Sequence, residues 1–161
     1  MKDRIKKIIN EVQFNAVSIF GKNIDLILVG STARNEFTGY VRNNKIYAYS
    51  DLEFVLINKF PSFVVSSKVQ EFNKRLELLT NKHFHESGYE GIECWCMSQY
   101  FFKKSRTVFF LEAKKNGLSI INGLNTNRKI NSKVDKKDLN EILLHRAMNM
   151  CRKLIQNVMN P

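Results

Sequence analysis

Two short stretches, LVGSTAR at residues 28–34 and YSDLEFV at residues 49–55, decide the fold. The first closes a compact apolar run, residues 24–29, which predicts a buried strand that enters a tight turn at Gly30 and Ser31. We expect residues 31–36 to open a short helix. The second begins a strand-like run, residues 52–57, directly after Asp51. Because successive side chains on a strand point to opposite faces, Asp51 and Glu53 are expected to share one face.

The residue types in these stretches suit a magnesium-bound triphosphate. Two like charges on one face need a cation, and magnesium prefers carboxylate oxygens together with substrate phosphates. Two such ions can clamp the attacking and leaving oxygens of a phosphoryl displacement. Gly30 permits a sharp turn and a close approach by phosphate, while Ser31 offers a hydroxyl and a backbone donor near a helix N-terminus. The pattern predicts a site with Asp51 and Glu53 as metal ligands.

A third carboxylate is available on a later strand. Glu93 lies in the apolar run IECWC, residues 92–96, where an acid without a partner would be costly. We expect it to join the same metal site. Glu112 is a second candidate, because it alternates with apolar residues in a run, residues 106–113, that also reads as a strand. The choice between Glu93 and Glu112 stays open from sequence.

The remaining pattern is that of a mixed α/β (α+β) domain at residues 1–123, followed by a polar linker at 124–137 and a C-terminal amphipathic helix at 138–161. Helical spacing of apolar residues predicts a first helix over residues 2–20 and another from Ser62 to about Lys82. Residues 37–49 suit a loop or a small hairpin around Asn43 and Asn44. Further strands are expected at residues 91–97 and 118–121.

Composition limits the compartment and the partners. The chain of 161 residues is 43% hydrophobic, carries a formal charge of +11, and has no apolar run long enough to span a bilayer. Its first ten residues lack the apolar stretch of a signal peptide. We therefore expect a cytoplasmic protein with no membrane partner and with Cys94, Cys96 and Cys151 reduced. The basic charge attracts polyanions, which include nucleic acids, nucleoside triphosphates and acidic proteins.

The two decisive stretches resemble the paired signature of the nucleotidyltransferases related to DNA polymerase β. Their form, with Asp-x-Glu and a later Glu on a strand, is similar to the nucleotide-binding domain of kanamycin (aminoglycoside 4′) nucleotidyltransferases. The resemblance covers residues 24–123, in which residues 110–123 look like the closing hairpin of the minimal domain. Residues 36–49 would then be an insertion of unknown purpose that borders the site.

The resemblance implies transfer of a nucleoside monophosphate from a triphosphate, which we expect to be ATP, to an acceptor hydroxyl, with pyrophosphate leaving. Asp51 and Glu53 would bind magnesium, with two ions expected, and Glu93 would complete the metal site or help activate the hydroxyl. Gly30 and Ser31 would hold phosphates. Arg34 falls where many members of the family have a basic residue near the triphosphate, and its fixed charge suits that contact.

Other functions share this site. A minimal nucleotidyltransferase-fold antitoxin would bind or modify a helical ribonuclease toxin, with the helix expected at 138–159 as a protein-binding surface. A catalytically silent regulatory domain, or the N-terminal piece of a longer protein, is a third possibility. The acceptor stays open among small molecules, proteins and nucleic-acid ends. Trp95 suits stacking on a base or simple packing. The sequence disfavours a metal role for His83 and His85, which have no nearby ligand set, and it favours a solvated helix face over a base role for Glu141.

Overall fold

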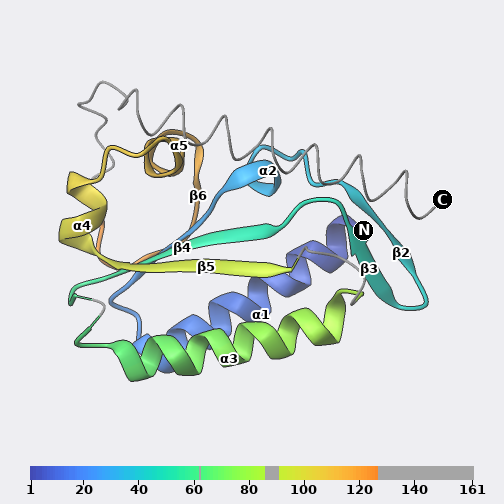
Figure 1. Cartoon of the computed structure of the whole chain (residues 1–161), viewed down its shortest axis with the longest axis horizontal. Coiled ribbons are helices and arrows are strands. Elements are labelled where there is room, and N and C mark those ends of the chain that lie inside the picture. The colour runs from blue at the N-terminus through green and yellow to red at the C-terminus, as the bar shows by residue number, and fades with distance from the viewer. Residues whose placement is uncertain (62, 86–90, 127–161) are drawn as a thin grey trace, which may run out of the picture.

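The computed structural model describes residues 1–61, 63–85 and 91–126 (Figure 1). Helices and strands are mixed along this part of the chain. In order, they are α1 (Lys2–Phe20), β1 (Asp25–Leu28), α2 (Gly30–Ala33), β2 (Gly39–Arg42), β3 (Lys45–Ala48), β4 (Leu52–Asn58), α3 (Ser66–His83), β5 (Ile92–Ser98), α4 (Gln99–Lys104), α5 (Val108–Asn116) and β6 (Leu118–Asn122).

The central sheet has four strands in the order β5-β4-β1-β6. β1 pairs antiparallel with β4 and with β6, whereas β5 runs parallel to β4. The parallel pair is joined through α3, the crossover helix that such a connection requires. β2 and β3 form a separate two-stranded sheet. The mixed α+β fold, a mixed sheet flanked by helices, is the one that the sequence predicts.

Helices cover both faces of the sheet (Figure 1). α1 and α3 pack on one face, where residues such as Val12, Phe54 and Phe72 form the larger buried cluster. The rings of Phe20 and Phe72 meet edge to face at 5.7 Å between centroids. The alternate residues of the strands, such as Val55, form a second cluster with α4 and α5 on the opposite face. Since Asp51 and Glu53 alternate with the first set, they lie on this second face.

The turn between β2 and β3 confirms a hairpin around Asn43 and Asn44. Both residues have positive φ, 48° and 61°, as a two-residue turn between antiparallel strands requires. Asparagine tolerates this conformation better than other side chains do. The hairpin makes up most of residues 36–49, the expected insertion, and it connects α2 to β4.

The strand expected over residues 106–113 is wrong. Residues Val108–Asn116 form helix α5, whose buried residues Phe110, Leu111, Ala113 and Lys114 have helical spacing. The β-forming run at residues 108–110 favoured a strand, but packing against the sheet overrode that propensity. The expected closing hairpin over 110–123 is accordingly a helix followed by β6.

Two further boundaries differ from the sequence prediction. α3 begins at Ser66, later than the expected Ser62, because residues 63–65 lie in a turn, where the N–H of Val64 donates to the carbonyl of Pro61 (3.0 Å). The short helix α4 was not foreseen; the hydroxyl of Ser98 caps it by accepting from the N–H of Phe101 (3.2 Å).

Residues 124–126 are tied back to β1. The buried carboxylate of Asp25 accepts from the backbone N–H of Leu124 (2.8 Å) and of Thr126 (2.9 Å). The rest of the expected linker and the expected C-terminal helix lie outside the described residues. Within the described ranges, no helix is long and apolar enough to cross a membrane.

Candidate active site

A cavity of about 450 Å³ opens where β1 passes into α2 and where β4 begins. It brings together the two stretches that decided the fold. Its lining residues are Val29, Gly30, Ser31, Arg34, Tyr49, Ser50, Asp51, Glu53, Phe109 and Glu112. Five of the six site residues expected from sequence therefore line one cavity, and the sixth, Glu93, lies outside that lining.

Antiparallel pairing of β1 with β4 places Gly30 against Glu53. Leu28 lies opposite Phe54, and the N–H of Val29 donates to the carbonyl of Glu53 (2.9 Å). Gly30 has a φ of 68°, and a Cβ added there would overlap with Oε2 of Glu53 and lie 3.1 Å from its Cδ. Glycine is therefore needed at residue 30 for two reasons, the left-handed backbone and the space that the carboxylate occupies.

Asp51 is held at the junction of β4 and β5. Its Oδ1 accepts from the N–H of Gly91 (3.0 Å), while the N–H of Leu52 donates to the carbonyl of Gly91 (2.9 Å). These two bonds fix the backbone before β4 and direct one oxygen of the carboxylate toward β5. The side chain is half-buried and lines the cavity with Glu53.

Glu93 extends the row of carboxylates on β5. It lies directly beside Glu53 in the parallel register of β4 and β5. Glu93 is exposed on β5, but partial loss of hydration and the nearby charge of Asp51 raise its pKa above the usual value. The electrostatic coupling to Asp51 indicates that the two carboxylates lie near one another, so the structure brings all three expected acids to one face of the sheet.

The donor set suits magnesium held jointly by protein and substrate. In the ranges that the structure describes, no group of three His, Cys, Asp or Glu side chains forms a ready-made metal site. Magnesium is usually held by one or two carboxylates plus substrate phosphates, and it keeps several waters. Asp51 and Glu53 would provide the two carboxylates, and they line the same cavity as the Gly30–Ser31 turn.

Arg34 enters the cavity from the end of α2 and pairs with two acids. Its Nε donates to Oε2 of Glu36 (2.8 Å), and its Nη1 donates to Oε1 of Glu112 on α5. The hydrogen bond with Glu36 contributes most to raising the pKa of Arg34. The expected place of Arg34 beside the triphosphate site is consistent with this geometry. Glu112 lies on helix α5, lines the cavity and pairs with Arg34, whereas Glu93 lies on β5 beside Glu53 and outside the cavity lining.

Two aromatic residues, Phe109 and Tyr49, line the cavity, and Trp95 lies next to Phe109 outside the lining. Phe109 lies 5.6 Å from Trp95, centroid to centroid, with a tilted geometry, and 51% of Trp95 is exposed. Tyr49 is 63% exposed and lines the cavity on the side of β3. Sequence reasoning found Trp95 but missed Phe109 and Tyr49. Helical spacing in residues 108–116 would have placed Phe109 beside Glu112 on the cavity side.

The remaining candidates have structural roles. His83 lies 3.2 Å from Glu11, which also accepts from Lys82 (2.9 Å), so this group ties α3 to α1. The neighbouring Lys82 and His83 lower the pKa of Glu11 against the opposing effect of burial. Cys94 and Cys96 are thiols that are partly buried against the core beneath α1 and α3. Cys151 and Glu141 lie outside the described residues.

Comparisons with known proteins add little to this geometry. No protein-family model matches the chain, and no curated protein matches it. Among solved structures, the chain is similar to one from a crystal structure of a mutant of the toxin–antitoxin MntA-HpeT. The identity is 12% and the TM-score 0.38, with 94% of this chain and 98% of the other covered. A likeness this weak carries no argument about fold or function.

Proposed function

We propose that this chain is a magnesium-dependent nucleotidyltransferase of the polymerase-β type. The observation that carries the proposal is the cavity in which Asp51 and Glu53 from the start of β4 face the Gly30–Ser31 turn that follows β1. A carboxylate pair and a glycine turn on adjacent strands suit a divalent cation and the phosphates that it binds. The resemblance of residues 28–34 and 49–55 to that family points the same way.

In the proposed reaction, an acceptor hydroxyl oxygen forms a bond to the α-phosphorus of the triphosphate. The bond from that phosphorus to the bridging oxygen breaks, and pyrophosphate leaves with the electron pair. Bound magnesium would neutralise the charge on the phosphates. Gly30 and Ser31 would hold the phosphate tail, and Arg34 would exchange a carboxylate for a phosphate oxygen, since a guanidinium binds both in the same planar geometry.

Two roles are open to Glu93, and one substitution separates them. In the first role, Glu93 binds magnesium together with Asp51. In the second, Glu93 accepts the proton of the acceptor hydroxyl, and its raised pKa suits it to that task. With Glu93→Gln, a ligand role predicts weaker magnesium-dependent binding of triphosphate. A proton-acceptor role predicts normal binding and slower transfer.

The proposal is tested by calorimetric titration of the four nucleoside triphosphates with magnesium. The wild type should bind at least one of them, and the double variant Asp51→Asn, Glu53→Gln should lose that binding. A matched control, Asp3→Asn with Glu77→Gln, makes the same charge change on exposed positions of α1 and α3 and should bind as the wild type does. Failure of every triphosphate to bind the wild type would reject the enzyme proposal for this chain alone.

A second candidate keeps the cavity and changes the output. In it, the chain is a nucleotidyltransferase-fold antitoxin that binds or modifies a helical ribonuclease toxin. Exposed aromatic residues favour a protein partner, because Phe60 and Phe63 follow β4 while Tyr100 and Phe101 follow β5 at the same end of these parallel strands. Lys59, Lys103 and Lys104 flank them.

The antitoxin proposal is tested by coexpression with candidate helical ribonucleases. Relief of growth arrest by the wild type supports it. If Asp51→Asn, Glu53→Gln relieves the arrest equally, the output is binding, and if that variant fails while still binding, the output is modification. If the wild type relieves the growth arrest of no tested ribonuclease but transfers a nucleotide to another acceptor, the antitoxin proposal is rejected and the first proposal is supported.

A further inference from the structure

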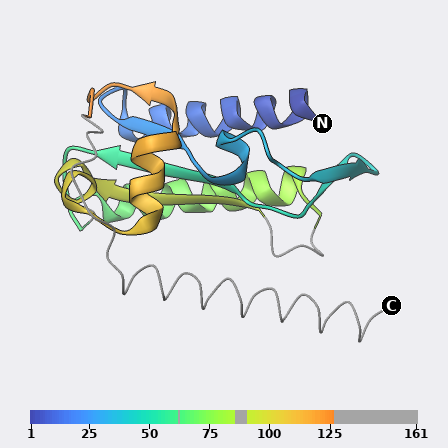
Figure 2. The same cartoon turned by 90° about the horizontal axis from the view of Figure 1, so that it is seen from above.

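The β2–β3 hairpin stands apart from the main sheet and borders the cavity. It connects the two stretches that line the cavity, since β2 follows α2 and β3 precedes β4. Figures 1 and 2 both show it projecting at one end of the molecule, beside the N-terminal end of α1. Ile46 and Ala48 of β3 belong to the larger buried cluster, so the hairpin is anchored in the core at a fixed place beside the cavity.

A column of aromatic rings runs along the hairpin. Tyr40 and Tyr47 stack at 4.9 Å between centroids with an angle of 6°, and Tyr47 stacks on His85 at 4.2 Å. On the other side, Tyr40 lies 6.2 Å from Tyr49 with a tilt of 47°. The column therefore extends from His85 to Tyr49, which is both 63% exposed and part of the cavity lining.

Hairpin stability accounts for only part of this column. Tyr40 and Tyr47 are direct cross-strand partners, and such aromatic pairs commonly stabilise two strands. Tyr49 lies one residue beyond the end of β3, where its N–H donates to the carbonyl of Thr38 (3.0 Å) and its ring meets Tyr40 diagonally. Its ring is mostly open to solvent at the mouth of the cavity, where an exposed aromatic face suits a planar ligand.

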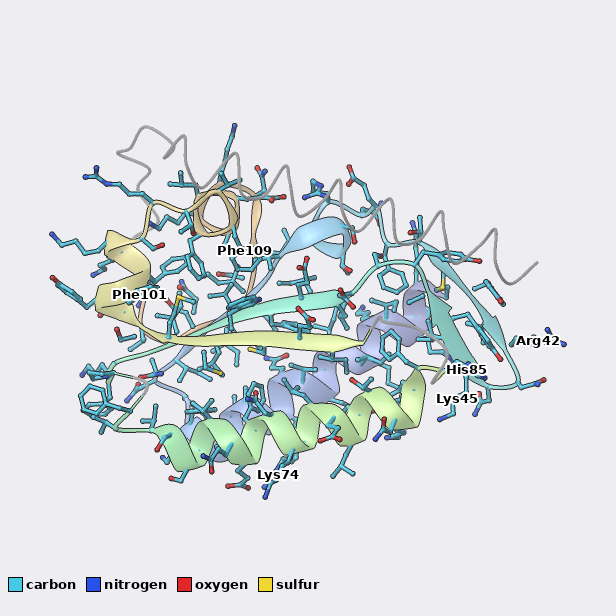
Figure 3. The ribbon with its side chains drawn as sticks, viewed as in Figure 1. Arg42, Lys45, Lys74, His85, Phe101 and Phe109 are labelled. Atoms are coloured by element: carbon cyan, nitrogen blue, oxygen red, sulfur yellow. The ribbon has the colours of Figure 1, made fainter. Side chains whose placement is uncertain are left out.

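Positive charge gathers around the column. The guanidinium of Arg4 on α1 donates to the carbonyl of Asn44 at the hairpin turn (2.8 Å), which places the start of α1 beside the hairpin. Residues 2–7 and 39–48 together contain six lysines and arginines against one acid, Asp3. Figure 3 shows Arg42, Lys45 and His85 at this end of the molecule. A polyanion would thus meet cations and aromatic faces together.

We propose that this hairpin surface, residues 39–49 with residues 2–7 and His85, binds a single-stranded polynucleotide and directs its end into the cavity. Single strands are held in this way elsewhere, by cations along the backbone and by aromatic side chains on which bases stack. A base on Tyr49 would bring the terminal hydroxyl next to Asp51 and Glu53. The acceptor role rests on the proposed nucleotidyl transfer, whereas binding of the strand does not.

The test is fluorescence anisotropy with end-labelled 12-residue oligomers of RNA and of DNA, without nucleotide. We expect binding that weakens as salt rises, and Tyr49→Ala should lower the affinity by about 5- to 100-fold if one base stacks there. Arg42→Gln should reduce the slope of log affinity against log salt by about 0.7. Matched controls are Phe14→Ala, an equally exposed aromatic on α1, and Lys74→Gln on α3, far from the hairpin (Figure 3).

Each outcome decides the proposal. Loss of affinity in Tyr49→Ala and Arg42→Gln but not in the controls supports it, and the difference between RNA and DNA names the strand. No binding of either oligomer, or equal loss in the controls, would overturn it. So would equally tight binding of an acidic peptide that Tyr49→Ala leaves unchanged. Triphosphate titration on the same wild-type sample keeps the two proposals separate, because strand binding without triphosphate binding would reject only the enzyme.

Discussion

Replacing Gly30 by alanine should disable the site while leaving the fold intact. Gly30 has a φ of 68°, and an added Cβ would overlap with the carboxylate of Glu53. The overlapping atom is the far end of a flexible side chain that lines the cavity, so the carboxylate can turn away instead of forcing the strands apart. The substitution at Gly30 therefore acts on the side chain of Glu53, although Glu53 lies on the neighbouring strand β4.

The expected magnitudes follow from these two effects. A non-glycine residue held at positive φ costs about 1–3 kcal/mol, which in a chain of this size lowers Tm by about 2–12 °C. Moving the carboxylate to another rotamer adds about 1 kcal/mol. Displacing a metal ligand should weaken binding of the magnesium triphosphate by about 10- to 100-fold or more.

A second glycine provides the control. Gly21 has a φ of 81°, and a Cβ added there would meet nothing within 4 Å. Gly21→Ala should thus lose stability in urea unfolding, but should bind triphosphate as the wild type does. Gly30→Ala combined with Glu53→Gln should bind no more weakly than either single variant, because both remove the same carboxylate from the cavity. Retained magnesium-dependent binding in Gly30→Ala would refute this reasoning.

Three further substitutions test the charges and caps. The pKa of Glu93 is raised above its usual 4.5, so ionisation of this carboxyl costs stability at pH values above that range. Glu93→Gln should therefore raise Tm at pH 7, and this gain should vanish near pH 3. An equal gain in Tm at both pH values would contradict the account. Asp25→Ala removes the acceptor of two backbone N–H groups, at Leu124 and Thr126. The loss should lower the free energy of urea unfolding by about 2–4 kcal/mol and speed proteolysis after residue 123. An unchanged cleavage rate would show that these hydrogen bonds do not hold the segment. Arg34→Gln breaks two half-exposed ion pairs, so the free energy of unfolding should change by less than about 1 kcal/mol. The affinity for triphosphate should fall by roughly tenfold or more. An unchanged affinity in calorimetric titration would show that Arg34 does not bind the triphosphate.

The sheet and its carboxylates were predictable because short-range patterns encode them. The apolar runs at residues 24–29 and 52–57 became β1 and β4, and alternation placed Asp51 and Glu53 on one face. Periodicity did not predict the parallel pairing that sets Glu93 beside Glu53, whereas the strands themselves and the shared face of Asp51 and Glu53 were predicted. These features depend on periodicity and on turn residues, which a single sequence carries.

The misassigned helix shows what periodicity alone cannot decide. In α5, the last of the four buried positions is taken by Lys114, which is 7% exposed and whose pKa is lowered by desolvation. Its Nζ donates to the carbonyls of Lys103 (3.3 Å) and Ser105 (2.7 Å) at the end of α4. A lysine in that role hides the helical stripe from a reader of the sequence. Tertiary contacts, and not propensity, selected the helix.

Contacts between distant residues were equally out of reach. The pair of Arg34 with Glu112 joins residues 78 apart in sequence, and Asp25 caps a segment about 100 residues later. The aromatic column depends on His85 meeting the hairpin, because the N–H of His85 donates to the carbonyl of Ile46 (2.9 Å). None of these pairings has a local signal, since each is set by how the helices close over the sheet.

The most direct test of the central claim is a crystal structure with manganese and a triphosphate that cannot be cleaved between its α- and β-phosphates. Anomalous scattering locates manganese independently of the protein coordinates. The account predicts an anomalous peak within ligand distance of the carboxylates of Asp51 and Glu53, with the phosphates beside Gly30 and Ser31. Nucleotide bound elsewhere, or a cavity that stays empty of manganese at saturating concentration, would contradict it.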